Sequence, residues 1–447
     1  MRLADRLERL PENRELVRSA HTTLTRDQAT QGVDAVPSLQ GARIALQVAD
    51  ISHALVALSA LDGIADSILL LSPALDPDTA LELVRNGACD AVLCDTPDQF
   101  ADLPAAADLQ GIAAQFDGPR AAPTETRWIM TTSGTTGTPK LVSHTLSSLT
   151  RSTRVDANRG AGQSWGMLYD YTRFAGLQVV LQSVLSGACL IAPDYAAPLE
   201  DKLDLFAANG CTHLSGTPTL WRKIVMTPGC NRLPLQQVTL GGEISDDRVL
   251  AAVAATYPDA RVVHIFASTE AGVGFSVRDG KAGFPETYLT DPPAGVELRV
   301  TDDQLFIRNP RVAQAYLGTD TAFASVDGWV ATGDLVSIRN GRVFFLGRGS
   351  GVINVGGDKV HPEKVETALL AHPLVSVARV YSKSNPITGA LVAADIMLSD
   401  PETDPKTARQ DILAHARNHL ARFEVPAMLR IVDDMTLNSA GKLVRKG

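Results

Sequence analysis

The feature that most constrains the fold of this chain is a regular alternation of short apolar runs and helical segments near its beginning. The apolar runs cover residues 42–48, 66–73 and 91–95, and each is short enough to be a buried strand. Segments 53–65 and 79–90 lie between them and have the composition of helices. Since parallel strands need a crossover that is usually a helix, this order predicts an α/β domain with parallel strands.

The pattern repeats and then changes twice along the chain. A second round of strands and helices runs through residues 178–270, and from about Val296 short alternating strands predict a small β-barrel-like layer. Further on, strands mix with amphipathic helices, as in a separate α+β domain. We therefore expect an α/β protein whose large N-terminal domain, 1–348, holds two α/β subdomains and the β-barrel-like layer, followed by a small α+β C-terminal domain, 349–447. Residues 3–20 are expected to form a polar helix.

Composition and charge exclude several classes of protein. The chain has 447 residues, of which 45% are hydrophobic and 20% charged, an ordinary globular composition. Its net charge of -9 argues against a general nucleic-acid binder. No segment approaches the roughly 20 apolar residues that a membrane-spanning helix needs, and the five cysteines form no CxxC pair. We expect a soluble, cytoplasmic protein with reduced cysteines, with no nucleic acid as its partner and no membrane span.

A Gly/Thr-rich loop at residues 131–140, TTSGTTGTPK, has a clear chemical character. Its glycines allow the backbone to approach a ligand closely, and its hydroxyl and N–H groups, together with Lys140, are donors for phosphate oxygens. The alternative is an ordinary surface turn, which the same residue types favour. The spacing GxxGxxK differs from that of the P-loop, in which the lysine directly follows the second glycine.

Further short segments are each weak on their own. Residues 241–243, GGE, follow a strand-like run and are either a ligand contact or a turn. Glu270 and Asp334 follow strand-like runs too, where a carboxylate binds Mg²⁺ or ribose hydroxyls, or is simply solvated. The glycine-rich segment 347–363 coincides with the expected domain boundary. Lys442 lies in a basic C-terminal segment, where it is either solvated or reaches a reacting carboxylate and phosphate.

All of these segments, in this order and at these spacings, resemble the core motifs of the adenylate-forming superfamily. That superfamily includes acyl-CoA and aryl-CoA synthetases, the adenylation domains of non-ribosomal peptide synthetases and firefly luciferase. The resemblance covers nearly the whole chain and is weak only over about the first 40 residues. It implies ATP-dependent activation of a carboxylic acid to an acyl-AMP, with release of pyrophosphate, and transfer of the acyl group to a thiol.

The resemblance also implies a nucleotide site. Phe266 stacks on adenine, and Asp334 holds the ribose hydroxyls. Thr269 contacts the α-phosphate, which Lys442 bridges to the carboxylate of the acid. Family members usually have Tyr-Gly where this chain has Phe266-Ala267, so a hydroxyl is lost while the aromatic face is kept. The expected nucleotide-binding residues are Thr132, Ser133, Gly134, Thr135, Thr136, Gly137, Lys140, Gly242, Glu243, Phe266, Ala267, Ser268, Asp334 and Arg348, with Thr269 and Lys442 as catalytic residues and Glu270 as the Mg²⁺ ligand.

The acid is expected to lie against a set of residues that the resemblance places around the acyl pocket: Arg173, Phe174, Gly176, Gly241 and Gly272. Arg173 stands where relatives often have a histidine, and an unpaired guanidinium is costly to bury. It therefore needs a partner, which is either Asp170 or a polar group of the substrate.

Finally, the resemblance implies that the C-terminal domain is mobile. Ser350 occupies the hinge position, and rotation brings Gly356 and Gly357 towards a pantetheine thiol. We expect ATP, Mg²⁺ and coenzyme A as cofactors and a small-molecule carboxylic acid as substrate. One alternative is a free-standing adenylation enzyme that loads the phosphopantetheine arm of an acyl carrier protein. Another is a non-catalytic acyl or nucleotide sensor.

Overall fold

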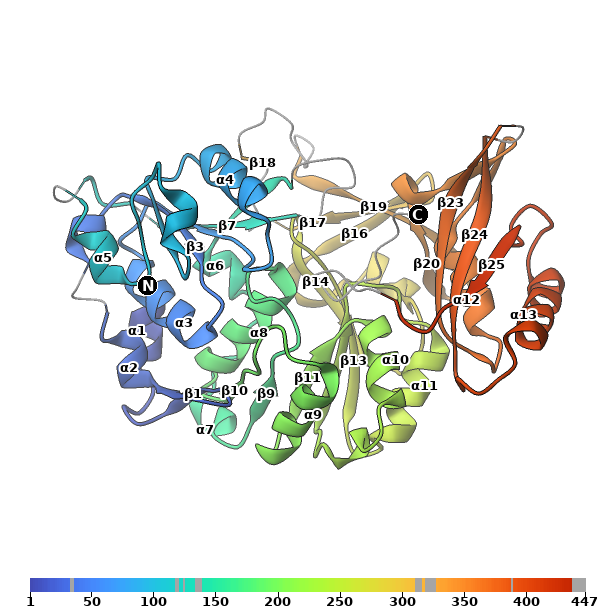
Figure 1. Ribbon diagram of the computed structural model, residues 1–447, viewed down its shortest axis with the longest axis horizontal. Helices are drawn as coiled ribbons and strands as arrows, with labels where there is room; N and C mark the ends of the chain where they lie inside the picture. The colour runs from blue at the N-terminus through green and yellow to red at the C-terminus, as the bar shows by residue number, and fades with distance from the viewer. Residues whose placement is uncertain are drawn as a thin grey trace.

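A computed structural model describes residues 1–32, 36–116, 120–123, 125–132, 139–309, 316–317, 327–386 and 389–435. Figure 1 shows the chain passing from the N-terminal α/β region through a central α/β region to a β-rich layer and the C-terminal domain. This is a mixed α/β fold with a large N-terminal part and a smaller C-terminal part, as the sequence predicts.

The N-terminal sheet has the strand order β18-β8-β7-β4-β3-β5-β6. Its strands are β3 (Arg43–Gln47), β4 (Ser67–Leu70), β5 (Ala91–Cys94), β6 (Ala105–Ala106), β7 (Arg127–Thr131), β8 (Leu141–Thr145) and β18 (Tyr316–Leu317). The strands β3, β4, β5 and β7 are parallel, with the helices α3 (Ile51–Leu61) and α4 (Pro77–Asn86) as crossovers. The predicted alternation of strands and helices is thus confirmed here.

A second sheet has the strand order β14-β13-β12-β11-β9-β10-β1-β2. Its strands are β1 (Glu15–Arg18), β2 (Thr23–Thr25), β9 (Ser164–Gly166), β10 (Cys189–Ile191), β11 (His213–Gly216), β12 (Gln237–Gly241), β13 (Arg261–Ser268) and β14 (Gly272–Val277). The strands from β9 to β13 are parallel to their neighbours, and β14 runs antiparallel to β13. The carboxyl ends of β11, β12 and β13 therefore meet at one edge.

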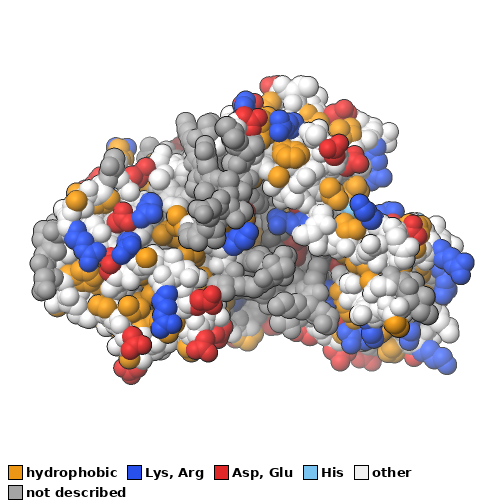
Figure 2. Space-filling model, turned by 90° about the horizontal axis from the view of Figure 1, so that it is seen from above, with side chains coloured by type: hydrophobic (Ala, Val, Ile, Leu, Met, Phe, Trp, Pro, Cys, Tyr) orange, Lys and Arg blue, Asp and Glu red, His pale blue; other side chains and the backbone are white. Residues whose placement is uncertain are grey.

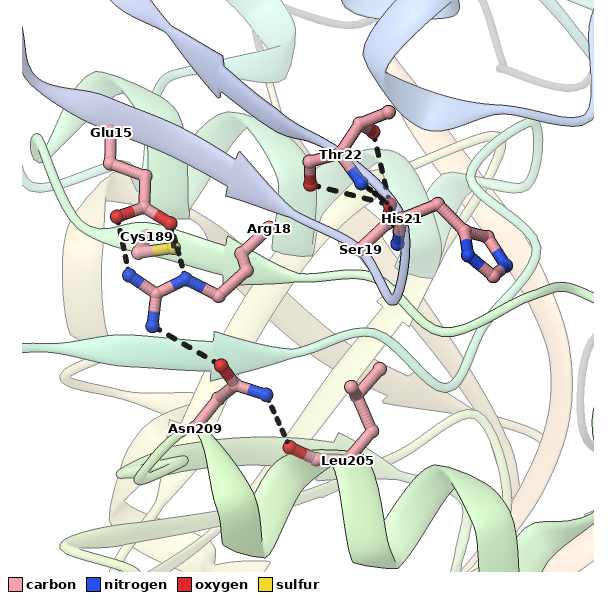
Figure 3. A network of polar contacts seen from close by, with 8 residues as sticks. All are labelled: Glu15, Arg18, Ser19, His21, Thr22, Cys189, Leu205 and Asn209. Atoms are coloured by element: carbon pink, nitrogen blue, oxygen red, sulfur yellow. Dashed lines mark hydrogen bonds and ion pairs between the residues drawn. The ribbon is translucent and has the colours of Figure 1, made fainter.

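The predicted helix over residues 3–20 is wrong. The helix α1 covers Leu3–Leu7 only, and β1 follows as a strand parallel to β10. Pro11 removes a helical hydrogen-bond donor, and Leu16 and Val17 are fully buried in the sheet. Figure 3 shows that Arg18 pairs with Glu15 and donates to Oδ1 of Asn209 at 3.2 Å.

The helix α8 (Phe174–Leu185) positions the site because it has two different faces. Leu177, Val180 and Val184 are fully buried in a core that also contains side chains of β1, β3 and β4. Gln178 and Gln182 lie on the other side of the helix and line a cavity. The remaining helices of the large part include α2 (Arg26–Thr30), α5 (Leu109–Ala113), α6 (Leu146–Leu149), α7 (Ala157–Gly160), α9 (Leu199–Ala208), α10 (Pro218–Met226) and α11 (Asp247–Thr256).

The predicted β-rich layer is an antiparallel sheet with the strand order β15-β20-β19-β17-β16. Its strands are β15 (Phe284–Pro285), β16 (Glu297–Thr301), β17 (Gln304–Arg308), β19 (Trp329–Arg339) and β20 (Arg342–Arg348). The C-terminal domain contains the hairpin of β21 (Ile353–Val355) and β22 (Asp358–Val360), the strands β23 (Val375–Asn385), β24 (Gly389–Leu398) and β25 (Met428–Ile431), and the helices α12 (Pro362–Leu370) and α13 (Pro405–His419).

The C-terminal domain contacts the large part at specific polar positions. Arg248 of α11 donates to the carbonyl of His372 at 2.9 Å, and Lys223 of α10 pairs with Asp434 at 2.9 Å. Charged side chains of both signs are interspersed on the face of the molecule seen in Figure 2. None of the helices in the described part of the chain combines the length and hydrophobicity that crossing a bilayer requires.

Candidate active site

A cavity of about 1150 Å³ runs along one face of β11, β12 and β13. Successive side chains of a strand point to opposite faces, so on β11 and β12 alternate residues line the cavity, whereas β13 contributes residues of both faces. These residues are His213, Ser215 and Thr217 on or next to β11, Gln237, Thr239 and Gly241 on β12, and Arg261, Val263, Ile265 and Ala267 on β13, together with His264, Phe266 and Ser268 on the opposite face of β13. The strand register aligns His213 with Gln237 and Gln237 with Arg261, so these three residues lie side by side at the amino end of the strands.

The helix α8 covers this face of the sheet. Its residues Phe174, Gln178, Gln182 and the following Ser186 are each four positions apart, so they form one stripe towards the cavity. Phe174 lies at the carboxyl end of the strands, and Ser186 lies at their amino end. The space between helix and sheet is therefore a channel that follows the strands.

Thr269 and Glu270 lie in the turn after β13, at the carboxyl edge of the sheet, and both line the cavity. The carbonyl of Thr269 is 2.6 Å from Nε2 of His144, a residue of β8. Burial lowers the pKa of His144, so its imidazole is neutral and Nε2–H donates to this carbonyl. His144 thus fixes the Thr269 turn. It was missed in the sequence because a lone histidine in a strand carries no pattern of its own.

Tyr316 lies between Glu270 and Lys140. The hydroxyl of Tyr316 donates to Oε1 of Glu270 at 3.4 Å, and Nζ of Lys140 lies 4.3 Å from the centre of the Tyr316 ring. The structure thus brings the lysine of the Gly/Thr loop close to the predicted Mg²⁺ ligand. Proteins usually hold Mg²⁺ by one or two carboxylates together with substrate phosphates and water, and Glu270 fits such a site. The described residues contain no group of three or more His, Cys, Asp or Glu side chains that could hold a metal ion by themselves.

Asp334 and Arg348 come from the paired strands β19 and β20 and lie opposite each other in the register. Oδ1 of Asp334 is 3.4 Å from Nε of Arg348. Both residues line the cavity, and the carboxylate is largely buried whereas the guanidinium is half exposed. The arrangement holds an acceptor for hydroxyl groups in a fixed position.

Phe266 lies within a group of aromatic rings. Its ring is nearly parallel to that of Phe275, with centroids 5.3 Å apart, and to that of Phe345, with centroids 5.4 Å apart. All three rings line the cavity. The aromatic surface next to Phe266 is therefore broader than the motif alone indicates, and stacking of adenine on it stays a prediction.

The guanidinium of Arg173 binds the end of β7. Its Nη1 donates to Oγ1 of Thr131 at 2.6 Å and to the carbonyl of the same residue at 3.3 Å. Oδ1 of Asp170 accepts instead from the N–H and hydroxyl of Thr172, at 2.9 and 2.7 Å. The described residues contain no ion pair between Arg173 and Asp170, so that alternative is wrong for this structure. Nε of Arg173 is buried without a hydrogen-bond partner.

Glu243 and Gly176 have structural functions in addition to any contact with a ligand. Oε2 of Glu243 accepts from the backbone N–H of Thr219 at 3.0 Å, which satisfies a donor in the first turn of α10. A Cβ atom on Gly176 would lie 2.1 Å from the carbonyl oxygen of Asp170, so only glycine fits there. Neither use is visible in a single sequence.

The structure brings most of the predicted site residues together. Those that line the cavity are Thr132, Arg173, Phe174, Gly241, Gly242, Glu243, Phe266, Ala267, Ser268, Thr269, Glu270, Asp334 and Arg348. Lys140, Gly176, Gly272, Ser350, Gly356 and Gly357 do not line it in this arrangement of the domains. Ser133, Gly134, Thr135, Thr136, Gly137 and Lys442 lie outside the described residues.

The sequence analysis also missed several arginines that line the cavity, among them Arg154, Arg159, Arg261 and Arg278. A signal was present in the run RSTRVDANR at 151–159, which holds several arginines within a short segment. The other two arginines come from distant strands, so only the fold shows that they belong together.

Comparisons with known proteins agree with this geometry. A family model described as AMP-binding enzyme matches residues 29–317, and one described as AMP-binding enzyme C-terminal domain matches residues 364–442. A 2-succinylbenzoate–CoA ligase of Bacillus velezensis is 26% identical over 394 residues, which span 83% of this chain and 77% of the relative. The corresponding ligase of Escherichia coli is 26% identical over 437 residues, spanning 94% and 88%.

Solved structures show the same fold. An o-succinylbenzoate-CoA synthetase of Bacillus subtilis in complex with its acyl-adenylate has a TM-score of 0.76 at 20% identity and covers 99% of this chain and 96% of its own. An anthranilate-CoA ligase in complex with anthranoyl-AMP has a TM-score of 0.82 at 16% identity, covering 99% and 95%. Since the two family models together match most of its residues, the chain belongs to the AMP-binding enzyme family.

Proposed function

We propose that this enzyme joins a small carboxylic acid to coenzyme A through an acyl-AMP intermediate. The observation that carries the proposal is the single cavity in which the Thr269–Glu270 turn, Asp334 and Arg173 meet. Relatives named as CoA ligases support coenzyme A as the acceptor, in place of the phosphopantetheine arm of a carrier protein. A cytoplasmic location remains the expectation from the sequence.

In the first step a carboxylate oxygen of the acid attacks the α-phosphorus of ATP. The bond between the α-phosphorus and the α,β-bridging oxygen breaks, and pyrophosphate leaves with its electron pair. Glu270 would hold Mg²⁺, which would supply positive charge to offset the negative charge of the phosphates. Asp334 orients the ribose, and the Thr269 turn, fixed by His144, presents its hydroxyl at the carboxyl edge of the sheet. Rate acceleration then comes mainly from positioning and from donors already in place.

In the second step the thiolate of coenzyme A attacks the acyl carbonyl and AMP leaves. We propose that rotation of the C-terminal domain at Ser350, with the domain boundary after Arg348, separates the two steps. Ser350 lies in the short 3₁₀ turn Gly349–Gly351, and glycines on both sides permit large backbone changes there. Gly356 and Gly357 of the exposed β21–β22 turn would then approach the thiol.

The substrate we propose is an acid with a second polar group close to the reacting carboxylate. Arg173 stands at the start of α8 and lines the cavity, and a keto or carboxylate oxygen could accept from the part of its guanidinium that does not bind Thr131. The relatives named as 2-succinylbenzoate–CoA ligases act on an acid of this kind. 2-Succinylbenzoate is therefore the first acid to test.

Release of pyrophosphate from ATP, measured over a panel of acids, tests the function. We expect adenylation of 2-succinylbenzoate or a related keto acid, and formation of its CoA thioester when coenzyme A is added. Lys442→Ala should abolish adenylation while thioester formation from preformed acyl-AMP persists. If no acid supports pyrophosphate release, the chain is a sensor and not a ligase. If a thioester forms only on a holo carrier protein, that protein is the acceptor in place of coenzyme A.

A further inference from the structure

The far end of the channel, at the amino edge of the sheet, carries a group of arginines that the reaction does not use. Arg154 follows α6, Arg159 lies in α7, Arg261 begins β13, and Arg278 follows β14. All four line the cavity that contains Thr269 and Asp334, and all four are exposed to solvent. We call this group the arginine mouth.

The backbone holds two of these arginines against α8. The N–H of Arg154 donates to Oε1 of Gln182 at 3.2 Å, and Nε2 of Gln182 donates back to the carbonyl of Arg154 at 3.3 Å. A Cβ atom on Gly160 would lie 1.7 Å from the carbonyl oxygen of Ser186, so α7 touches the end of α8 backbone to backbone. The segment that bears Arg154 and Arg159 is therefore fixed at the channel end.

The arginine mouth has an uncompensated positive charge. Within the described part of the chain, none of the four guanidinium groups has an ion pair with an acidic side chain. Arg261 donates to the neutral side chain of Gln237. Asp156 also lines the cavity and brings one negative charge to set against the four arginines, and its Oδ1 accepts from the backbone N–H of Arg159 at 3.2 Å.

The neighbouring groups respond to this charge. Burial, and then the charges of Arg278, Arg154 and Arg159, lower the pKa of Arg261. Burial, followed by the charges of Arg261 and Arg159, lowers the pKa of His213 to about 4. Arginines that repel one another in this way are stabilised by an anion placed among them, since each gains a charge-assisted hydrogen bond.

The channel joins the arginine mouth to the reaction site. Strand β13 rises from Arg261 to the Thr269 turn over a distance of about 26 Å, at roughly 3.3 Å per residue. Between them the lining contains Trp165, Val179, Val263 and Ile265, which suit a hydrocarbon chain, together with the polar Gln178, Ser215 and Thr239. An acid in the channel would thus have its reacting end at Thr269 and its other end directed at the arginines.

We propose that the arginine mouth binds a second anionic group at the far end of the acid substrate, a carboxylate for example, so that the enzyme accepts elongated acids with charge at both ends. This inference rests on the proposed ligase function and names the substrate class of the same site. It differs from recognition by Arg173, which concerns groups next to the reacting carboxylate.

The test uses straight-chain α,ω-dicarboxylic acids from suberic to hexadecanedioic acid, and the monomethyl ester of each as a control of equal length without the second charge. Pyrophosphate release in the absence of a thiol gives kcat/KM for each acid. We expect the diacid to exceed its ester by about tenfold at the length that spans the channel, the factor for one exposed charge-assisted hydrogen bond. The ratio of kcat/KM for the diacid to kcat/KM for its ester should decrease as the salt concentration is raised, because salt screens the charges of the exposed arginines.

Arg261→Gln and Arg278→Gln should each remove much of this preference and leave the kcat/KM of the ester unchanged. Arg409→Gln, an exposed arginine of α13 outside the cavity, is the matched control and should leave the preference intact. The inference is overturned if the preference for the diacid persists in both mouth variants, or if wild-type enzyme shows none at any length. It is also overturned if these variants change only KM for coenzyme A, since the mouth would then bind the phosphates of the acceptor.

Calorimetric binding of each diacid of the series and its monomethyl ester separates this inference from the proposed function. If no acid supports pyrophosphate release, the ligase proposal fails, while tighter binding of the diacid that disappears in Arg261→Gln still supports the arginine mouth. Equal binding of diacid and ester by the wild-type protein would overturn it whatever the activity.

Discussion

Replacing Arg173 by lysine tests how the acid is recognised, because it keeps the charge and removes the planar donor group. In the structure, Nη1 of Arg173 binds Thr131 and Nε is buried without a partner. A lysine cannot reproduce both the contact with Thr131 and a second donor aimed at the substrate. One hydrogen bond to a charged group is worth roughly 1.5–3 kcal/mol, which corresponds to a loss of about 10- to 150-fold in kcat/KM.

Pyrophosphate release with two kinds of acid measures this loss. Arg173→Lys should lower kcat/KM for acids with a keto or carboxylate group near the reacting end, and change it little for a simple aliphatic or benzoic acid. Thr131→Val removes the hydroxyl that orients the guanidinium and should cost on the order of 1 kcal/mol, the usual value for a neutral hydrogen bond. In the Arg173→Lys background the same change should cost much less, because the two residues act together. An equal loss for all acids, or additive effects in the double variant, would refute this reasoning and leave Arg173 a structural residue.

Four further outcomes are expected. Asp334→Asn should raise KM for ATP by about tenfold with little change in kcat, because the contact with the ribose is weakened equally in the ground state and the transition state. Glu270→Gln should instead lower kcat, with partial recovery at high Mg²⁺ in the same assay. Gly176→Ala should lower the thermal unfolding midpoint, because its Cβ would clash with backbone at a cost of roughly 1–3 kcal/mol. Burial lowers the pKa of His144, so in acid the unfolded chain binds more protons than the folded protein does. The midpoint of urea unfolding should therefore fall as the pH drops below 6.5.

The sequence predicted those parts of the fold that depend on local pattern. The apolar runs of β3, β4 and β5 are strands because they are short and buried, and the helices between them are long enough to cross the sheet. The error at residues 3–20 has a tertiary cause. Leu16 and Val17 fit either a helix or a strand by composition, and only pairing with β10 decides between the two.

The site was predicted where a contiguous motif bears the chemistry and missed where distant strands contribute one residue each. The turn at Thr269–Glu270 was found from its motif. His144, which fixes that turn, lies in β8 of the other sheet, and no local pattern points to it. The arginine mouth is a stronger case, because Arg261 aligns with Gln237 and His213 only through the register of three parallel strands.

The acidic residues of the site already have partners within the protein, which bears on how tightly ATP can bind. Asp334 lies against Arg348, and Glu270 accepts from Tyr316. Pairing lowers the cost of keeping a carboxylate in a partly buried cavity. A ligand that had to displace these partners would lose affinity, but a carboxylate accepts up to about four hydrogen bonds. Ribose hydroxyls can therefore add to the Asp334–Arg348 pair without breaking it, whereas Mg²⁺ at Glu270 must compete with the Tyr316 hydroxyl.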